Sequence, residues 1–242
     1  VARLLGGFKR DKGGQSQPRQ VQIIDASEKR PFELTICMPL GDQVDQTADE
    51  FNVVGNAATS PVPASIWPAI YPRLVALIDD HQSTMIFVNS RRLAERLAAS
   101  INETAEQDLA RAHHGSMSKD TRSEVEDRLK RGDLRAIVAT SSMELGLDVG
   151  AVDLVIQVEA PPSISSGLQR IGRAGHSVGA VSKGIVFPKY RGDLLSAAAA
   201  AQQMLNGQVE SSTYLRNPLD VLAQHIVAMV AMDEWEVEAL YQ

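Results

Sequence analysis

The stretch TMIFVNSRRLAERLAASI, residues 84–101, joins an apolar run with strand character to a helical pattern through a single serine. A short continuous apolar run such as 84–89 is typical of a strand that is covered on both faces of its sheet. Ser90 stands where a helix N-cap is expected, so a helix is predicted directly after the strand. A strand followed at once by a helix indicates an α/β unit.

The same alternation continues along the chain and predicts a parallel sheet with helices on both faces. Gly132 stands where the helix that begins after Ser118 should stop. The fold class is therefore α/β with a doubly wound parallel sheet, from about residue 31 to 208. Strands are predicted at 32–38, 84–89, 109–114, 134–140, 153–159 and 180–187, and helices at 65–80, 90–101, 118–132, near 142–146, through 169–176 and after Gly192.

The two ends of the chain differ from this central pattern. Residues 1–7 predict the end of a helix with a glycine stop, and residues 20–27 predict a short strand, together the tail of a preceding domain. Residues 41–60 are polar and predict a loop. Asn217 as a cap and Pro218 as the first helical residue predict a new helix that opens another domain.

Composition limits the functional classes. The 242 residues carry a formal charge of −6, which argues weakly against nonspecific coating of nucleic acid but permits a local basic track. Cys37 is the only cysteine, which excludes an intramolecular disulfide and a cysteine-based zinc cluster. No apolar run is long enough to span a membrane, so we expect a cytoplasmic protein without a membrane partner.

Ligands of open parallel sheets bind at the carboxyl ends of the strands, and two of the loops there carry polar groups suited to phosphate. Ser90 and Arg91 begin a helix, where free backbone amides and the helix dipole attract anions. Thr140 and Ser141 end a later strand and could hold a nucleic-acid phosphate without reading bases. The alternatives are an ordinary capped surface helix for the first loop and an Asx-type turn for the second.

A third stretch, QRIGRAGH at residues 169–176, places two arginines three positions apart in an acidic chain. On a helix, Arg170 and Arg173 would share one face, and Gln169 would approach Arg173. Paired guanidinium groups match phosphate oxygens, so the pattern indicates a polyphosphate ligand. Gly172 and Gly175 each cost a helix about 1 kcal/mol, a cost that suits a close ligand or backbone. The alternative is a surface helix whose arginines are paired by chance.

Other patterns in the sequence give weaker indications of a functional site. Asp79 and Asp80 resemble a magnesium-binding acid pair but follow a helical pattern, so we interpret them as a solvated helix end. His113 and His114 lack the spacing of a helical zinc pair, and no metal site is predicted; the HHGS segment, with His114 and Gly115, could instead contact nucleic acid. No G-x-x-x-x-G-K-[ST] motif occurs, so the arginines must serve a nucleotide that is held elsewhere.

Three segments, MIFVNSRRLAERLA, VATSSMELGLDVGAVDLVIQ and QRIGRAGH, resemble motifs IV, V and VI of superfamily 2 helicases in their order and spacing. The longer string from Ser141 to Leu194 resembles the large helicase-related (Lhr) family of ATP-dependent helicases. The close likeness runs from about residue 84 to 195. It implies a RecA-like helicase C-terminal domain at 31–208, the end of RecA-like domain 1 at 1–30, and the start of a winged-helix domain at 209–242.

The resemblance also implies roles for individual residues. ATP would lie between two RecA-like lobes, with the P-loop and the Mg²⁺ carboxylates in the first lobe. Arg173 would be the arginine finger, supported by Arg170 and Gln169. Gly146 and Asp148 match positions that link nucleotide to nucleic acid, and Thr140 matches a phosphate-contacting hydroxyl. His176 departs from the pattern, because many members carry a further arginine there.

The expected function is that of the second motor domain of an ATP-dependent helicase, translocating 3′ to 5′ on single-stranded DNA or on RNA:DNA hybrids. Its partners would be the nucleic acid and RecA-like domain 1 of the same polypeptide. The chain by itself should be inactive as an ATPase, because it lacks the P-loop. The alternative is a RecA-like module without catalysis that binds nucleic acid or another partner.

Overall fold

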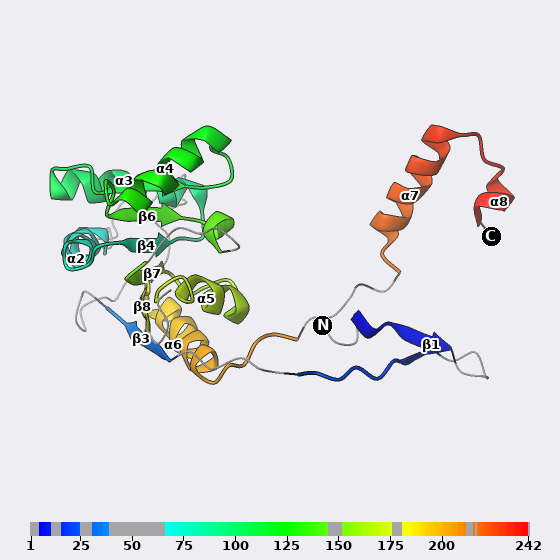
Figure 1. The fold of residues 1–242 in the computed structure, drawn as a ribbon, viewed down its shortest axis with the longest axis horizontal. Coiled ribbons are helices and arrows are strands. Elements are labelled where there is room, and N and C mark those ends of the chain that lie inside the picture. Colours follow the sequence, from blue (N-terminus) through cyan, green and yellow to red (C-terminus); the bar gives the residue numbers. More distant parts are fainter. Residues whose placement is uncertain are drawn as a thin grey trace, which may run out of the picture. The chain divides into compact units, whose positions relative to one another are not determined.

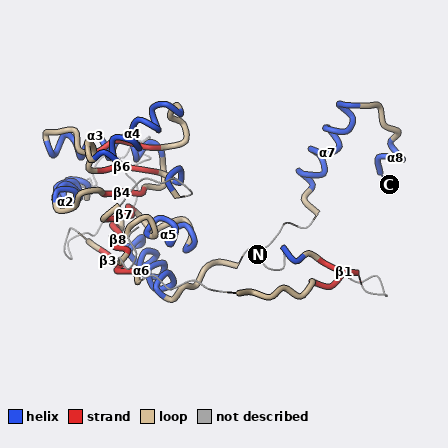
Figure 2. The backbone as a smooth tube through the Cα atoms, viewed as in Figure 1, coloured by secondary structure: helices blue, strands red, loops and turns tan. Residues whose placement is uncertain are grey.

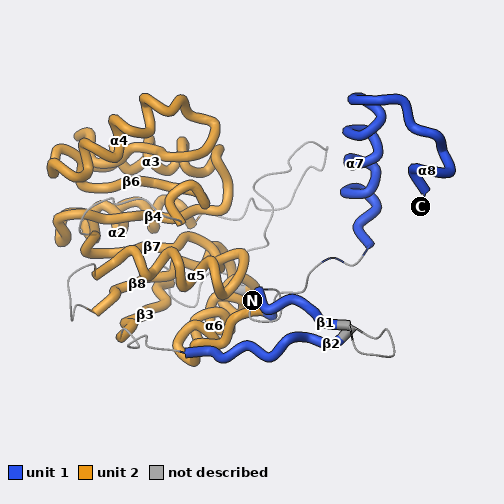
Figure 3. The backbone as a smooth tube through the Cα atoms, turned by 45° about the vertical axis from the view of Figure 1, so that its right-hand side comes forward, with its two compact units in different colours: residues 1–27, 211–242 blue, residues 28–210 orange. Residues whose placement is uncertain are grey.

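The structure, a computed structural model, describes residues 5–10, 16–24, 31–38, 66–144, 152–175, 181–211, 215 and 217–241. They form two compact units, coloured separately in Figure 3. The larger unit spans residues 28–210, and the smaller unit combines residues 1–27 with 211–242. The loop predicted at 41–60 lies outside the described residues.

The larger unit contains a six-stranded sheet in the order β3-β8-β7-β4-β6-β5, and every neighbouring pair is parallel. Every residue of β4, β6 and β7 is buried, as the continuous apolar runs predict. This arrangement, visible in Figures 1 and 2, confirms the α/β class with a parallel sheet. The strands are β3 (Phe32–Ile36), β4 (Thr84–Phe87), β5 (Ala110–His113), β6 (Ala136–Ala139), β7 (Leu154–Val158) and β8 (Ser182–Phe187).

Helices cover both faces of the sheet, and each face has its own apolar core. On one face, α2 (Trp67–Asp79) and α3 (Arg91–Ala105) pack over strand residues such as Ile86. On the other face, α4 (Lys119–Arg131), α5 (Ile164–Ile171) and α6 (Arg191–Leu205) pack over residues such as Phe87. Because side chains alternate along a strand, β4 contributes to both cores, as a doubly wound sheet requires.

The predicted helix ends agree with the geometry of their caps. Ser90 Oγ accepts a hydrogen bond from the Leu93 amide at 3.2 Å, and Ser118 Oγ accepts one from the Thr121 amide at 3.2 Å. Gly132 ends α4 with a φ of 76°, in the left-handed region that favours glycine. These caps fix where α3 begins and where α4 begins and ends relative to the neighbouring strands.

The smaller unit departs from the predictions in two places. Residues 20–24 form no strand, because strand propensity is insufficient where no partner strand pairs with the segment. Ile23 and Ile24 are accordingly 75% and 82% exposed. The strands there are β1 (Phe8–Arg10) and β2 (Ser16–Pro18), an antiparallel pair. Pro218 is extended and serves as the N-cap, so α7 (Leu219–Met232) begins one residue later than predicted, before α8 (Val237–Tyr241).

Membrane insertion finds no support among the helices of the described ranges. None of them combines the length and the apolar character that a membrane span needs.

A half-buried amide joins the end of α3 to the start of β5. Asn102 Oδ1 accepts hydrogen bonds from the amides of Leu109 (3.0 Å) and Ala110 (2.8 Å), and its Nδ2 donates to Ala110 O at 2.9 Å. This side chain satisfies the backbone of the turn between the helix and the strand.

Asn102→Asp should therefore lower the free energy of unfolding of the 242-residue chain by about 1–3 kcal/mol, because a carboxylate oxygen would face Ala110 O in place of a donor. Urea unfolding followed by circular dichroism measures this change. An unfolding midpoint equal to that of the unmodified chain would show that the bond at Ala110 contributes nothing to stability.

Candidate functional site

The sheet topology singles out the carboxyl ends of β4 and β7. The connection through α3 carries the chain from β4 toward β5, at one edge, whereas α5 carries it from β7 to β8, toward the other edge. The two connections diverge, so the switch point of the sheet lies between β4 and β7. Ligands of open α/β sheets bind outside the strand ends at such a point.

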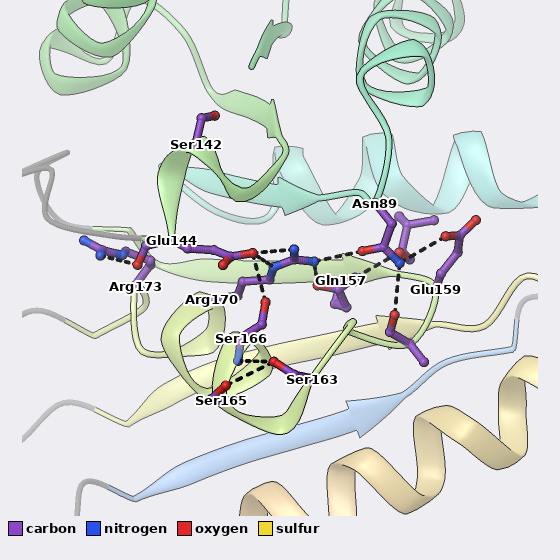
Figure 4. Close-up of polar contacts among 12 residues, drawn as sticks. Asn89, Ser142, Glu144, Gln157, Glu159, Ser163, Ser165, Ser166, Arg170 and Arg173 are labelled. Carbon is purple, nitrogen blue, oxygen red and sulfur yellow. Dashed lines mark hydrogen bonds and ion pairs between the residues drawn. The ribbon is translucent and has the colours of Figure 1, made fainter. Parts of the chain in front are cut away.

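Arg170 lies buried beside this point, with 2% of its surface exposed, and five residues form what we call the Arg170 cluster (Figure 4). Arg170 Nε donates to Glu144 Oε1 at 2.7 Å, and Nη2 of the same guanidinium forms an ion pair with that oxygen. Arg170 Nη1 donates to Gln157 Oε1 at 2.9 Å and to Asn89 Oδ1 at 3.1 Å. Ser166 Oγ completes the cluster by donating to Glu144 Oε1 at 2.9 Å.

The Arg170 guanidinium also lies 5.2 Å from the centre of the Phe87 ring, a cation–π contact. Its carboxylate partner, Glu144, is itself largely buried, with 14% of its side chain exposed. A buried charge needs both a counter-ion and hydrogen bonds, and the cluster supplies them. In this geometry the guanidinium of Arg170 donates to protein groups, and its expected contact with a phosphate stays a prediction.

Arg173 lies outside the helix that carries Arg170. Helix α5 ends at Ile171 with Gly172 as its C-cap, so the helical spacing expected for Arg170, Arg173 and Gln169 does not apply. Gln169 is exposed and Arg173 is half-buried. Arg173 Nη2 donates to the backbone oxygen of Glu144 at 2.5 Å, and Figure 4 shows this side chain beyond Glu144, on the side away from Asn89.

Gly175 lies where two backbone segments approach each other closely. Gly175 has a φ of 74°, and a Cβ there would lie 3.2 Å from Val181 O. Two segments of the chain therefore meet at this glycine, which explains its presence without a ligand. Of the two reasons offered for the glycines, a close ligand or a close backbone, the second applies at residue 175.

Arg91 and the loop after β5 lie together at the strand ends. Arg91 is exposed, and its Nη1 donates to Ser116 Oγ at 2.5 Å. Ser90 and Gly115 are exposed beside them. His114 is not: it is 7% exposed and its Nε2 lies 2.8 Å from Glu95 Oε1. The ring is buried against α3, and its expected contact with nucleic acid stays a prediction.

The end of β6 leads into a short 3-10 helix, η1 (Ser141–Met143), and the two predicted residues there differ in exposure. Ser141 is exposed and Thr140 is half-buried, with its amide donating to His113 O at 3.2 Å. Burial lowers the pKa of His113 below its usual range, although Glu126, 2.9 Å from its Nε2, opposes the shift. His113 is a buried group, and its Nδ1 lies 2.9 Å from the Oγ of Ser142 in η1. Gly146, Asp148 and His176 lie outside the described residues.

Glu144, Asn89 and Gln157 were missed at the level of sequence. Asn89 could have been found, since it directly precedes the predicted cap Ser90 at a strand end. Glu144 and Gln157 give no local signal, because their partner Arg170 is distant in sequence. Across the parts of the chain that the structure describes, no group of His, Cys, Asp or Glu side chains could hold a metal ion.

The two arginines should differ sharply in their effect on stability. Arg170→Ala should lower the free energy of unfolding by about 3–5 kcal/mol, because it leaves the Glu144 carboxylate largely buried without its counter-ion. Arg173→Ala should cost about 1.5–3 kcal/mol, the range for a hydrogen bond to a charged group. Urea unfolding of both variants measures the difference; equal losses would contradict the structural role of Arg170.

Comparison with known proteins gives two family matches. The family model for the helicase conserved C-terminal domain matches residues 69–177, and the model for the winged-helix domain of the large helicase-related protein matches residues 202–242.

Individual relatives carry the same family name. An Lhr helicase of Mycolicibacterium smegmatis is 50% identical over 252 aligned residues, which cover 90% of this chain and 16% of the relative. The ATP-dependent helicase Lhr-Core protein 2 of Thermococcus barophilus is 37% identical, with 100% of this chain and 26% of the relative covered.

A solved structure, that of Mycobacterium smegmatis helicase Lhr bound to ssDNA and AMP-PNP, superposes with a TM-score of 0.73 at 47% identity. The match covers 88% of this chain and 27% of that one, so the chain spans only part of the relatives it resembles. The two family models, the sequence relatives and the superposed structure agree. The chain belongs to the large helicase-related (Lhr) family of superfamily 2 helicases and contains their RecA-like helicase C-terminal domain.

Proposed function

We propose that this chain is the second motor lobe of an ATP-dependent nucleic-acid helicase, and that it supplies an arginine to a nucleotide held by another lobe. The observation that carries the proposal is the position of Arg173: it is half-buried, follows α5 directly and is anchored on the backbone of Glu144. The buried Arg170 cluster holds that backbone in place.

Arg173 suits the role of an arginine finger. When bound between two lobes, ATP with Mg²⁺ supplies the phosphoryl group whose hydrolysis drives the motor. A guanidinium is permanently charged and donates in a planar fork, so it can neutralise charge that develops on phosphoryl oxygens. The sequence has no P-loop, which assigns the binding of ATP and Mg²⁺ mainly to RecA-like domain 1. Gly146 and Asp148 are proposed to line the nucleotide side of this lobe, and Gln169 to support Arg173.

The nucleic-acid strand is proposed to cross the carboxyl ends of β4, β6 and β5. The groups proposed to hold it are three hydroxyls, the backbone of a glycine and the guanidinium of Arg91, together with the amides at the start of α3. Such groups hold phosphates without reading base identity, as a translocating motor requires. The proposed contacts are Ser90, Arg91, Gly115, Thr140 and Ser141.

Substrate and direction follow from the family likeness. We propose single-stranded DNA or an RNA:DNA hybrid as the substrate and 3′ to 5′ translocation. The proposed division of the chain is the end of RecA-like domain 1 at 1–30, the helicase C-terminal domain at 31–208 and the start of a winged-helix domain at 209–242. The winged-helix match at residues 202–242 supports the last of these.

Arg173→Ala in the full-length protein should lower the rate of ATP hydrolysis about 10³-fold or more, the effect of removing an arginine finger. Binding of single-stranded DNA should change little, because Arg173 is not among the proposed strand contacts. Arg131→Ala is the matched control, since Arg131 is an exposed arginine at the opposite end of the strands, paired with Asp133. Steady-state ATP turnover near the unmodified rate would remove the finger assignment. A full-length protein without any ATP turnover would instead favour a binding module without catalysis.

Arg91→Ala should weaken binding of a single-stranded oligonucleotide and reduce its salt dependence, because one phosphate contact is lost. For one contact the slope of log K against log salt should fall by about 0.7. Titration by fluorescence anisotropy at several salt concentrations measures it, again beside Arg131→Ala. An unchanged slope would place the strand away from the start of α3.

A further inference from the structure

Asn89 occupies the switch point between β4 and β7, and its side-chain amide is used at both ends (Figure 4). Its Oδ1 accepts from Arg170 Nη1 at 3.1 Å. Its Nδ2 donates to Glu159 Oε2 at 3.1 Å and to Ala160 O at 3.0 Å. One short side chain therefore joins the end of β4 to the end of β7 and to α5.

The contacts continue beyond Asn89 into what we call the polar chain: Glu144, Arg170, Asn89, Glu159 and Lys189. Lys189 Nζ donates to Glu159 Oε1 at 2.5 Å, at the end of β8. Glu159 has a φ of 68°, a backbone conformation that a residue with a side chain adopts only at a cost. The polar chain crosses the carboxyl ends of β6, β4, β7 and β8, and Asn89 joins its two halves.

Asn89 is also the residue directly before Ser90 and Arg91, the proposed strand contacts at the start of α3. A movement of this helix start on binding nucleic acid would carry Asn89 with it. Through Arg170, that movement reaches Glu144, and the backbone oxygen of Glu144 holds Arg173. The contacts between the two proposed sites are therefore continuous.

We propose that Asn89 is a positioning residue that couples nucleic acid at the start of α3 to Arg173, so that ATP hydrolysis responds to the bound strand. The inference rests on the proposed function and deepens it. The role requires an amide side chain at residue 89, because this position needs an acceptor toward Arg170 and a donor toward Glu159. A carboxylate would keep the first contact and set two negative charges against each other at the second.

The test uses Asn89→Asp in the full-length protein and compares ATP turnover with and without single-stranded DNA. The ratio of the two rates should fall about tenfold, which equals about 1.4 kcal/mol of coupling. The dissociation constant for the strand should stay within about threefold of the unmodified value, since Asn89 is not a proposed contact. Asn89→Ala, which removes all three side-chain hydrogen bonds without adding charge, should lower the ratio too.

Three further variants separate coupling from a general loss of stability. Asn102→Asp makes the same chemical change at the structural amide near the amino ends of the strands, so it should lower stability and leave the ratio unchanged. The double variant N89D/E159Q moves the amide donor from residue 89 to residue 159, so it should restore most of the ratio of ATP turnover that N89D loses. E159Q alone should not raise this ratio above that of the unmodified protein.

The outcomes distinguish this inference from the function on which it rests. An unmodified protein without DNA-stimulated ATP turnover overturns both. If the unmodified protein is stimulated and both Asn89 variants keep its ratio, the coupling role fails and the motor function stands. A loss in Asn102→Asp equal to that in Asn89→Asp, or no recovery in N89D/E159Q, also overturns the coupling role.

Discussion

The candidate site depends on the neutralisation of one buried guanidinium. Arg170 carries a permanent charge into a place where water does not reach, beside the apolar ring of Phe87. It can be accommodated only if a carboxylate and amide oxygens meet it there, and those groups come from three separate segments of the chain. The loop after β6, the end of β4 and strand β7 are thereby held in one arrangement relative to α5.

This constraint gives the two arginines of QRIGRAGH different tasks. Helix α5 ends between them, so Arg170 turns into the core while Arg173 emerges from the turn after the helix. Glu144 connects the two: its carboxylate binds Arg170 and its backbone oxygen accepts from Arg173. A charged side chain that acts on a ligand needs a well-defined position. A neighbouring buried charge restrains that position more closely than apolar packing would, because its hydrogen bonds are directional.

Local patterns predicted the fold well and the site only in part. The apolar runs located all six strands of the parallel sheet, and Ser90, Ser118 and Gly132 located three helix ends, because each of these signals acts within a few residues. The burial of Arg170 could not be predicted in this way. Its partner Asn89 lies 81 positions away and Glu144 lies 26 away, so the cluster exists only once the sheet has brought the strand ends together.

The helical pattern itself caused the principal error. Spacing of three and four residues predicts that Gln169, Arg170 and Arg173 share one helical face, yet the helix ends at Ile171, before Arg173. Gly172 is the C-cap, and Gly175 permits the close approach to Val181.

The same sheet geometry explains why an amide stands at residue 89. The connections through α3 and α5 leave β4 and β7 in opposite directions, so these two helices diverge from the gap between the strand ends. Polar groups on either side must then satisfy one another, and the side chain that does so has to accept from a cation and donate to an anion. Asparagine is short enough to act from the strand end itself and offers both functions. The place where the topology predicts a ligand is thus also where the two halves of the sheet are joined by hydrogen bonds, and these bonds are the route of the coupling that we propose.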